Sequence, residues 1–304
     1  MAGRYVTLEN RAVITLAGED RATFLQGLIS NDIHKCAPDH AIWAALLTPQ
    51  GKFLHEFNVV DAGEMYWVDC EAPRMMDLGQ RLRRYQLRSK VTLDIGRDLA
   101  VFAVLDTDPA GFGLGGEAGQ VVPLADGFAF VDARRPEMGL RVIAPRAAAQ
   151  QAFAKLNLIE DDQAVYDKLR MSLGIPEGSA DMEPEKAILL ENGFDELQGV
   201  DWNKGCFMGQ ELTARTKYRG LVKKRLLPVV SVDGKDLPAD GTILSEGREI
   251  GQLRSVAGAR GLALVRLERW RHAMEHGHPL AVGDAAVVID VPDWVDLQAN
   301  TASK

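Results

Sequence analysis

Cysteine is scarce in this sequence. Three cysteines occur among 304 residues, and Cys36, Cys70 and Cys206 lie far apart with no C-x-x-C pair. An odd and scattered set of cysteines indicates neither a disulfide framework nor a self-contained zinc site. We therefore expect a protein of a reducing compartment and predict a cytoplasmic location.

Long apolar runs are also lacking. No uncharged apolar stretch approaches the ~20 residues that a membrane-spanning helix needs. The opening segment MAGRYVTLENRAVITL has no basic region followed by a continuous apolar region, so it does not predict export. With 46% hydrophobic and 26% charged residues, the chain has a globular composition, and we expect no membrane partner.

Positive charge is in deficit, since the net charge is −8 and the isoelectric point is near 5.4. Such a chain has no overall field that would hold a polyanion, and we expect no direct binding of nucleic acid. Two local basic clusters, at residues 81–90 and 216–225, each carry five basic side chains. Solvated helix or loop faces are the ordinary interpretation of such clusters.

The pattern of apolar residues predicts an α+β fold. Three apolar runs within residues 41–71 are separated by turn residues, which indicates consecutive antiparallel strands. Helical spacing appears at 72–86, 146–157 and 161–173. Because strands flank these helices without strict alternation, the sequence favours antiparallel sheets over a doubly wound sheet.

The texture changes near residue 225, after which short strands are divided by Gly and Asp turns. This pattern is typical of a small antiparallel barrel. We predict two domains: residues 1–225, with two lobes divided near 95–145, and a C-terminal β-barrel over 226–304.

The segment Lys204-Gly205-Cys206-Phe207-Met208-Gly209-Gln210-Glu211 is the strongest candidate site. A lone cysteine is usually a small buried hydrophobe. Here the flanking glycines favour an accessible sulfur, and a lysine two residues before it favours a lowered thiol pKa. Whether the thiol attacks an electrophile or ligates a metal stays open. Glu211 and Arg215 are four residues apart on an expected helix, which alone predicts a weak surface ion pair.

Three other sets of residues are further candidates for a site. His55 and Glu56 are adjacent in an expected strand, so only one of them can face a given cleft. Tyr166 lies on the apolar stripe of its helix; it is either a core residue or a ring that stacks on a heteroaromatic ligand while its hydroxyl stays in water. The segment RHAMEHGH (271–278) contains three histidines, and we expect a surface loop there.

The run KGCFMGQELTART resembles the K-G-C-[FY]-x-G-Q-E signature of the YgfZ family of folate-binding proteins, in particular its mitochondrial branch, which assists iron-sulfur cluster assembly. The segments GEDRATFLQGLISNDI, ALLTPQGKFLHEF, LRSKV and LRMSLGIPEG resemble the same family in the same order. The family is similar to the glycine cleavage T protein, an aminomethyltransferase. The resemblance implies subregions around a central folate funnel, a C-terminal barrel, and support of iron-sulfur enzymes that include a tRNA-modifying one.

Departures from the T protein bear on activity. His55-Glu56 replaces an Asp-Asp pair, Ser172 replaces a glutamate that grips the pterin, and an expected aromatic near the start falls on Arg11. The lost carboxylates are those expected to hold the substrate amine and the pterin. The resemblance therefore implies a folate-binding accessory factor, with a folate-dependent aminomethyl or one-carbon transferase as the alternative.

From these patterns and this resemblance we predict three groups of site residues. Cys206 and Lys204 form the reactive pair, with Cys206 as a possible metal ligand. Tetrahydrofolate or a one-carbon derivative is the expected cofactor, and iron-sulfur assembly or client proteins are the expected partners. The residues of the motif loop are Gly205, Phe207, Gly209, Gln210, Glu211 and Arg215, and those expected to bind folate are Tyr166, Arg84, Arg88 and Glu191.

Overall fold

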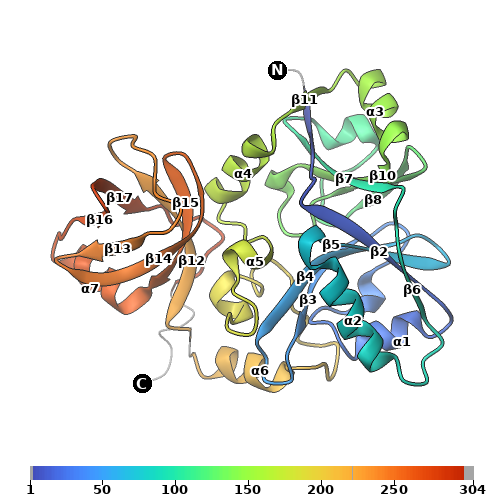
Figure 1. Ribbon diagram of the computed structural model, residues 1–304, viewed down its shortest axis with the longest axis horizontal. Helices are drawn as coiled ribbons and strands as arrows, with labels where there is room; N and C mark the ends of the chain where they lie inside the picture. The colour runs from blue at the N-terminus through green and yellow to red at the C-terminus, as the bar shows by residue number, and fades with distance from the viewer. Residues whose placement is uncertain (1–2, 221, 298–304) are drawn as a thin grey trace. The chain divides into compact units, whose positions relative to one another are not determined.

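The computed structural model describes residues 3–220 and 222–297, which divide into two compact units (Figure 1). The N-terminal unit consists of the chain up to Thr48 with Leu54–Tyr166 and Leu197–Met208. The barrel unit consists of Pro49–Phe53, Asp167–Glu196 and the chain from Gly209 onward. The Cys206 loop therefore belongs to the N-terminal unit, although it is distant in sequence from most of that unit.

A five-stranded sheet in the N-terminal unit has the order β3-β4-β5-β2-β6. The adjacent positions of β3, β4 and β5 confirm the consecutive strands predicted for residues 41–71. Helix α2 packs on this sheet through Leu78 and Leu82, which share a core with Ile14 and Leu16. The elements are β2 (Arg11–Ala17), α1 (Arg21–Gln26), β3 (Ile42–Leu47), β4 (Phe53–Asp61), β5 (Met65–Glu71), α2 (Met75–Gln86) and β6 (Thr92–Ile95).

A six-stranded sheet in the same unit has the order β11-β1-β7-β10-β9-β8. Helix α3 packs against it, because Ala149 and Phe153 enter a core with Tyr5 and Phe102 (Figure 1). The elements are β1 (Arg4–Thr7), β7 (Leu99–Leu105), β8 (Val121–Leu124), β9 (Gly127–Val131), β10 (Leu140–Pro145), α3 (Arg146–Lys155) and β11 (Ile159–Asp161). All of its pairings are antiparallel except that of β1 with β11.

Six strands of the barrel unit close in the order β12-β15-β14-β13-β16-β17. Closure leaves no open sheet edge, so a small sheet is protected from pairing with other chains. The strands are β12 (Lys224–Ser231), β13 (Thr242–Ser245), β14 (Arg248–Ala257), β15 (Arg260–Arg266), β16 (Leu280–Val282) and β17 (Ala285–Ile289). Together with the mixed helices and sheets of the other unit, the barrel confirms the predicted α+β class.

The expectation of a surface loop around residues 271–278 was partly wrong. Helix α7 (Leu267–Glu275) carries the first part of this segment, because Leu267 and Ala273 supply buried contacts to the barrel core. His272 and His276 stack on one exposed face, with ring centroids 4.2 Å apart. The polar composition of the segment concealed this one-sided apolar pattern.

Short helices connect these elements. They are α4 (Gln163–Ser172), α5 (Gly178–Asp181), α6 (Gln210–Tyr218) and the 3₁₀ helices η1 (Ile33–Lys35), η2 (Ala72–Arg74), η3 (Pro109–Phe112), η4 (Pro136–Met138) and η5 (Leu189–Asn192). Among the residues described, no helix combines the length and the apolar character required to cross a membrane.

Candidate functional site

The Cys206 side chain is exposed, whereas Cys36 and Cys70 are buried. Gly205 has a φ of +90° and Gly209 a φ of +81°, a region that glycine enters without steric cost. Since nothing lies within 4 Å of a Cβ built at Gly205, the backbone conformation rather than a lack of space favours glycine there. The predicted accessibility of the sulfur is confirmed.

Hydrogen bonds attach this loop to residues 26–35 of the same unit. The Gln26 side chain donates to the Lys204 carbonyl at 3.2 Å and also contacts Asp32, while the Met208 amide donates to the Gly27 carbonyl. Lys35 forms an ion pair with Asp201 at 2.6 Å. These contacts hold the loop on both sides of Cys206, so the thiol is presented from a fixed backbone.

The Lys204 side chain is directed toward the protein. Its ammonium group donates to the carbonyl oxygens of Ile29 and Asn31, and it lies 5.1 Å from the centre of the Phe207 ring. Burial lowers the pKa of Lys204 to about 8, although Asp32 and Asp201 oppose that shift. Phe207 is itself buried, so Lys204 and Phe207 together support the loop beneath Cys206.

Helix α6 begins directly after this loop, at Gln210. Glu211 and Arg215 form the ion pair expected from their spacing, at 3.2 Å. The Glu211 side chain is 90% exposed and that of Arg215 50%, so this contact contributes little to stability. A role for Gln210, Glu211 and Arg215 in shaping the thiol site stays a prediction.

Tyr166 is only 1% exposed, which agrees with the first of its two interpretations, a core residue, and not with a hydroxyl that stays in water. The hydroxyl accepts hydrogen bonds from Arg134 at 3.0 Å and from Arg141 at 2.9 Å. These two bonds replace the hydrogen bonds to water that the hydroxyl and the two guanidinium groups lose on burial. Tyr166 is thus a core residue held by cations, and its part in folate binding stays a prediction.

Those arginines belong to a chain of buried charges within the N-terminal unit. Asp69 accepts from Arg141 at 2.6 Å and from Arg11 at 2.8 Å. Arg11 also pairs with Glu56, whose other oxygen accepts from the Trp43 indole nitrogen at 2.8 Å. Buried charges require such pairing, since removal of one partner leaves an uncompensated ion.

The far end of this chain is the Asp132–Arg134 pair, at 2.7 Å. Burial acts to raise the pKa of Asp132, but Arg134 and Arg141 outweigh it and hold that pKa below its usual range. Burial likewise acts to lower the pKa of Arg141, but Asp69 and Tyr166 act together against it and the pKa is raised. Three carboxylates and three guanidinium groups are thus joined in one buried network: Arg11, Glu56, Asp69, Asp132, Arg134 and Arg141.

Sequence reasoning missed most of this network. It treated Arg11 only as the absence of an aromatic residue and did not consider Asp69 or Arg141. A usable signal was present for Asp69 and Arg141, because each interrupts an otherwise apolar strand that the fold buries. These strands are MYWVDCE and LRVIAP. Charged residues within such strands predict internal partners, although not which ones.

The remaining predicted residues lie in other places. Arg84 is exposed near the end of α2, and Arg88 is exposed two residues beyond it. Arg88 lines an open hollow of about 780 Å³ together with Phe24 and Tyr85. Glu191 lies in the barrel unit, where burial raises its pKa although Lys224 and Lys52 oppose the shift.

His55 and Glu56 contact different partners, as their opposite orientation on β4 requires. His55 Nε2 lies 2.9 Å from Asp77 Oδ2, and Arg81 holds the same carboxylate. Burial lowers the pKa of His55 to about 4; Arg74 adds to the shift and Asp77 opposes it. His55 is therefore a neutral, structurally engaged imidazole at neutral pH.

No group of three or more His, Cys, Asp or Glu side chains suited to a metal ion occurs within residues 3–220 and 222–297. Cys206 therefore belongs to no such preformed group among the described residues.

We expect the neutral His55 to make stability depend on pH. An unfolded histidine takes up its proton near pH 6.5, whereas the folded chain binds it only near pH 4. The unfolded state therefore binds more protons between these values, so the free energy of unfolding should fall by about 3 kcal/mol as pH drops through this window. Urea titrations of the wild type and of His55→Gln should show this loss only in the wild type.

The exposed His34 provides the matched control, because His34→Gln removes an imidazole that is not buried. That variant should keep the pH dependence of the wild type. An identical pH dependence in wild type and His55→Gln would contradict this account of His55.

Comparison with known proteins adds to this geometry. Residues 223–297 match the family described as CAF17, C-terminal beta-barrel domain. A solved structure, the glycine cleavage system aminomethyltransferase T from Bartonella henselae, superposes with a TM-score of 0.77 at 15% identity. The likeness covers 97% of this chain and 86% of that one, and it confirms the predicted T-protein-like fold.

Curated relatives match nearly the whole chain. Iron-sulfur cluster assembly factor IBA57, mitochondrial, from Mus musculus is 31% identical over 314 residues, 94% of this chain and 84% of its own length. The Homo sapiens protein of the same name is 31% identical, with the same coverage of 94% and 84%. The homologue from Pyricularia oryzae is 31% identical over 91% of this chain and 75% of its own length.

These relatives correct one prediction. The cytoplasmic location inferred from cysteine usage was wrong, because the relatives are mitochondrial proteins by name. Scarce cysteines indicate a reducing environment but do not distinguish one reducing compartment from another. The extent and the identity of these matches show that the chain belongs to the IBA57 family of iron-sulfur cluster assembly factors.

Proposed function

We propose that this protein acts in iron-sulfur cluster assembly through the thiol of Cys206. The names of its relatives supply the process. The exposed thiol on its anchored loop is the observation that carries the proposal, since it offers the soft sulfur ligand that iron-sulfur chemistry uses. The thiolate is the form of cysteine that binds a metal or attacks an electrophile. Because Cys206 is exposed, such a partner can contact its sulfur.

The partners are assembly or client proteins that carry the cluster. One thiolate cannot complete the ligand set of a cluster, which ordinarily takes four. The described residues provide no further metal-binding group of three, so the remaining ligands belong to the partner. Cys206 therefore acts at a protein contact, as one ligand or as a reactive thiol beside a client cluster. The proposed clients include enzymes that modify tRNA.

A reduced folate is the finer part of the proposal, in keeping with the likeness to the YgfZ family and the T-protein-like fold. Asn58 Oδ1 is a buried acceptor with no hydrogen-bond partner among the described residues, and the same amide donates to Asp69 at 3.0 Å. An N–H donor of a pterin fits this orphaned oxygen. The bound folate would supply a one-carbon carrier. Arg84 and Arg88 are exposed, and their guanidinium groups can pair with the glutamyl carboxylates of the folate.

Transferase activity is the less favoured alternative. His55 is buried against Asp77, and the Ser172 hydroxyl donates to the Leu169 carbonyl at 2.7 Å. Both side chains at the substituted positions therefore make local contacts. The buried carboxylates Glu56, Asp69 and Asp132 are each paired with an arginine, which disfavours them as general bases.

A thiol substitution tests the central proposal. In cells that depend on this protein, Cys206→Ser should reduce the activity of iron-sulfur enzymes to near that of the deletion, because a hydroxyl is a poor ligand for iron and a weak nucleophile. Cys36→Ala, at a buried position, is the matched control and should retain activity if the protein accumulates. Full enzyme activity with Cys206→Ser at normal protein levels would refute the role of the thiol.

Folate binding is tested separately by calorimetry on the purified chain. Arg84→Gln combined with Arg88→Gln should weaken binding of a pentaglutamyl tetrahydrofolate by about tenfold or more, since two charge-assisted contacts are lost. Binding of the monoglutamyl form should change little. Arg83→Gln on the same helix is the control, because Arg83 is directed to the Leu93 carbonyl at 3.4 Å.

Equal loss for both folates would contradict the assignment of these arginines to the glutamyl tail. Absence of binding to any reduced folate would remove the cofactor from the proposal without affecting the thiol. Turnover of a lipoyl-carried aminomethyl donor to methylene-tetrahydrofolate would instead support the transferase alternative.

A further inference from the structure

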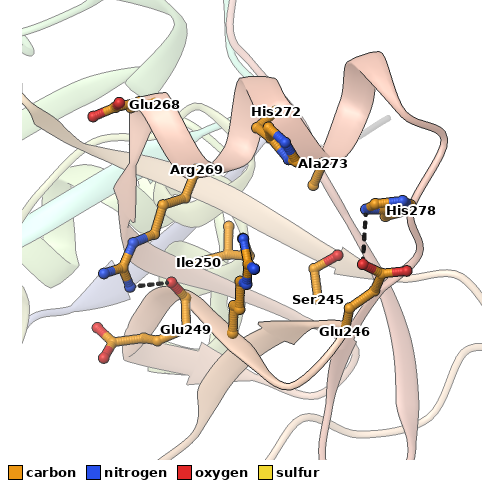
Figure 2. Close-up of a pocket in the computed structure, with 10 residues that line it drawn as sticks. Ser245, Glu246, Glu249, Ile250, Glu268, Arg269, His272, Ala273 and His278 are labelled. Carbon is orange, nitrogen blue, oxygen red and sulfur yellow. Dashed lines mark hydrogen bonds and ion pairs between the residues drawn. The ribbon is translucent and has the colours of Figure 1, made fainter.

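The barrel unit contains a hollow of about 510 Å³ between the β13–β14 hairpin and helix α7 (Figure 2). This volume is within the range of small-molecule sites in proteins. Ile250 and Ala273 give the hollow an apolar part, and several charged side chains surround it. Neither the Cys206 loop nor the predicted folate residues contribute to its lining.

Ser245 is the feature that distinguishes this hollow from an ordinary surface depression. Its side chain lines the hollow and is only 5% exposed, yet its hydroxyl has no hydrogen-bond partner among the described residues. Figure 2 shows the hydroxyl directed toward Ala273 and His278. Buried hydroxyl groups are normally paired, so an unpaired one aimed into a hollow indicates a missing acceptor or donor.

The hairpin geometry places a cation beside that hydroxyl. Ser245 and Arg248 are directly opposed across the hairpin, so their side chains lie on the same face of the two strands. The register then shifts between Ile243 and Leu244, and this bulge adds a residue on β14, where Ile250 lies. Bulges of this kind re-aim side chains and occur frequently beside functional sites.

The turn itself carries strain. Glu246 has a φ of +48° and Gly247 a φ of +74°, so both central residues of this two-residue turn are in the left-handed region. Asn or Asp commonly precedes Gly in such a turn, because the left-handed conformation disfavours longer side chains such as Glu. The Glu246 carboxylate lies 3.3 Å from His278 Nδ1, on the rim of the same hollow. That contact gives the strained residue a role at this site.

Helix α7 provides the opposite wall. Arg269, His272 and Ala273 lie on one helical face, at spacings of three and four residues. The Arg269 side chain reaches back to donate to the Glu249 carbonyl at 2.8 Å. The Glu249 carboxylate is paired at 3.1 Å with Arg266, which does not line the hollow.

Four hydrogen-bond donors line the hollow: the buried Ser245 hydroxyl, and at its exposed edge the guanidinium groups of Arg248 and Arg269 and the His272 ring. Of the three carboxylates, those of Glu246 and Glu249 are engaged with His278 and Arg266, while Glu268 is exposed at the start of α7. We propose that this hollow binds a small organic anion, with a carboxylate or phosphate head at these donors and an apolar part against Ile250 and Ala273.

The proposal is tested on the full chain by calorimetry and ligand-observed NMR with three probes of similar size: phenyl phosphate, phenylacetate and benzylamine. One or both anions should bind, and their relative affinity tells phosphate from carboxylate. Benzylamine should not bind. Preferential binding of benzylamine, or no binding of either anion, would overturn the proposal.

Substitutions locate the binding. Ser245→Ala and Arg269→Gln should each raise the dissociation constant of the better anion by about tenfold, the loss of one hydrogen bond to a charged group. Ser245→Ala should not lower the melting temperature, because its hydroxyl has no protein partner to lose. Arg260→Gln, on the same barrel and paired with Asp290 away from the hollow, is the control. Equal effects of the control and of both site variants would contradict the site.

Discussion

The carboxylate of Asp69 is the point on which the N-terminal unit depends. It is fully buried on β5, and it receives Arg11 from β2 and Arg141 from β10. Because β5 and β10 belong to different sheets, this one carboxylate connects the two sheets of the unit. Loss of a buried ionic partner ordinarily costs about 3–5 kcal/mol, because the remaining charge stays buried without compensation.

The same network limits what the unit can do chemically. Each of its carboxylates is paired with an arginine, and the Tyr166 hydroxyl accepts from two of those arginines. A general base must reach the proton that it abstracts, and carboxylates buried against arginines are poorly placed to do so. The thiol of Cys206 is instead exposed, on a loop supported by Lys204 and Phe207, and it carries the proposed function. The architecture thus shares the fold of an aminomethyltransferase, while the proposed function rests on the exposed thiol.

Sequence patterns predicted the features that depend on local physics. Apolar runs divided by turn residues predicted the consecutive strands β3 to β5 and a C-terminal barrel, and the glycines around Cys206 predicted its exposure. Partners distant in sequence could not be predicted in the same way. Arg11 and Asp69 are 58 residues apart, and Arg141 is 72 residues beyond Asp69, so only the fold brings them together. Helix α7 was missed because its apolar face is narrow.

Selective alkylation of Cys206 is the decisive experiment on the proposed role of this thiol. Cys36 and Cys70 are buried, and burial raises the pKa of Cys70 to about 12, so brief treatment of the folded chain with iodoacetamide should modify Cys206 alone. Mass spectrometry gives the modified fraction, and an extract depleted of this protein reports maturation of an iron-sulfur enzyme. The account predicts that activity falls in proportion to the modified fraction. Full activity from a completely alkylated, folded protein would contradict it.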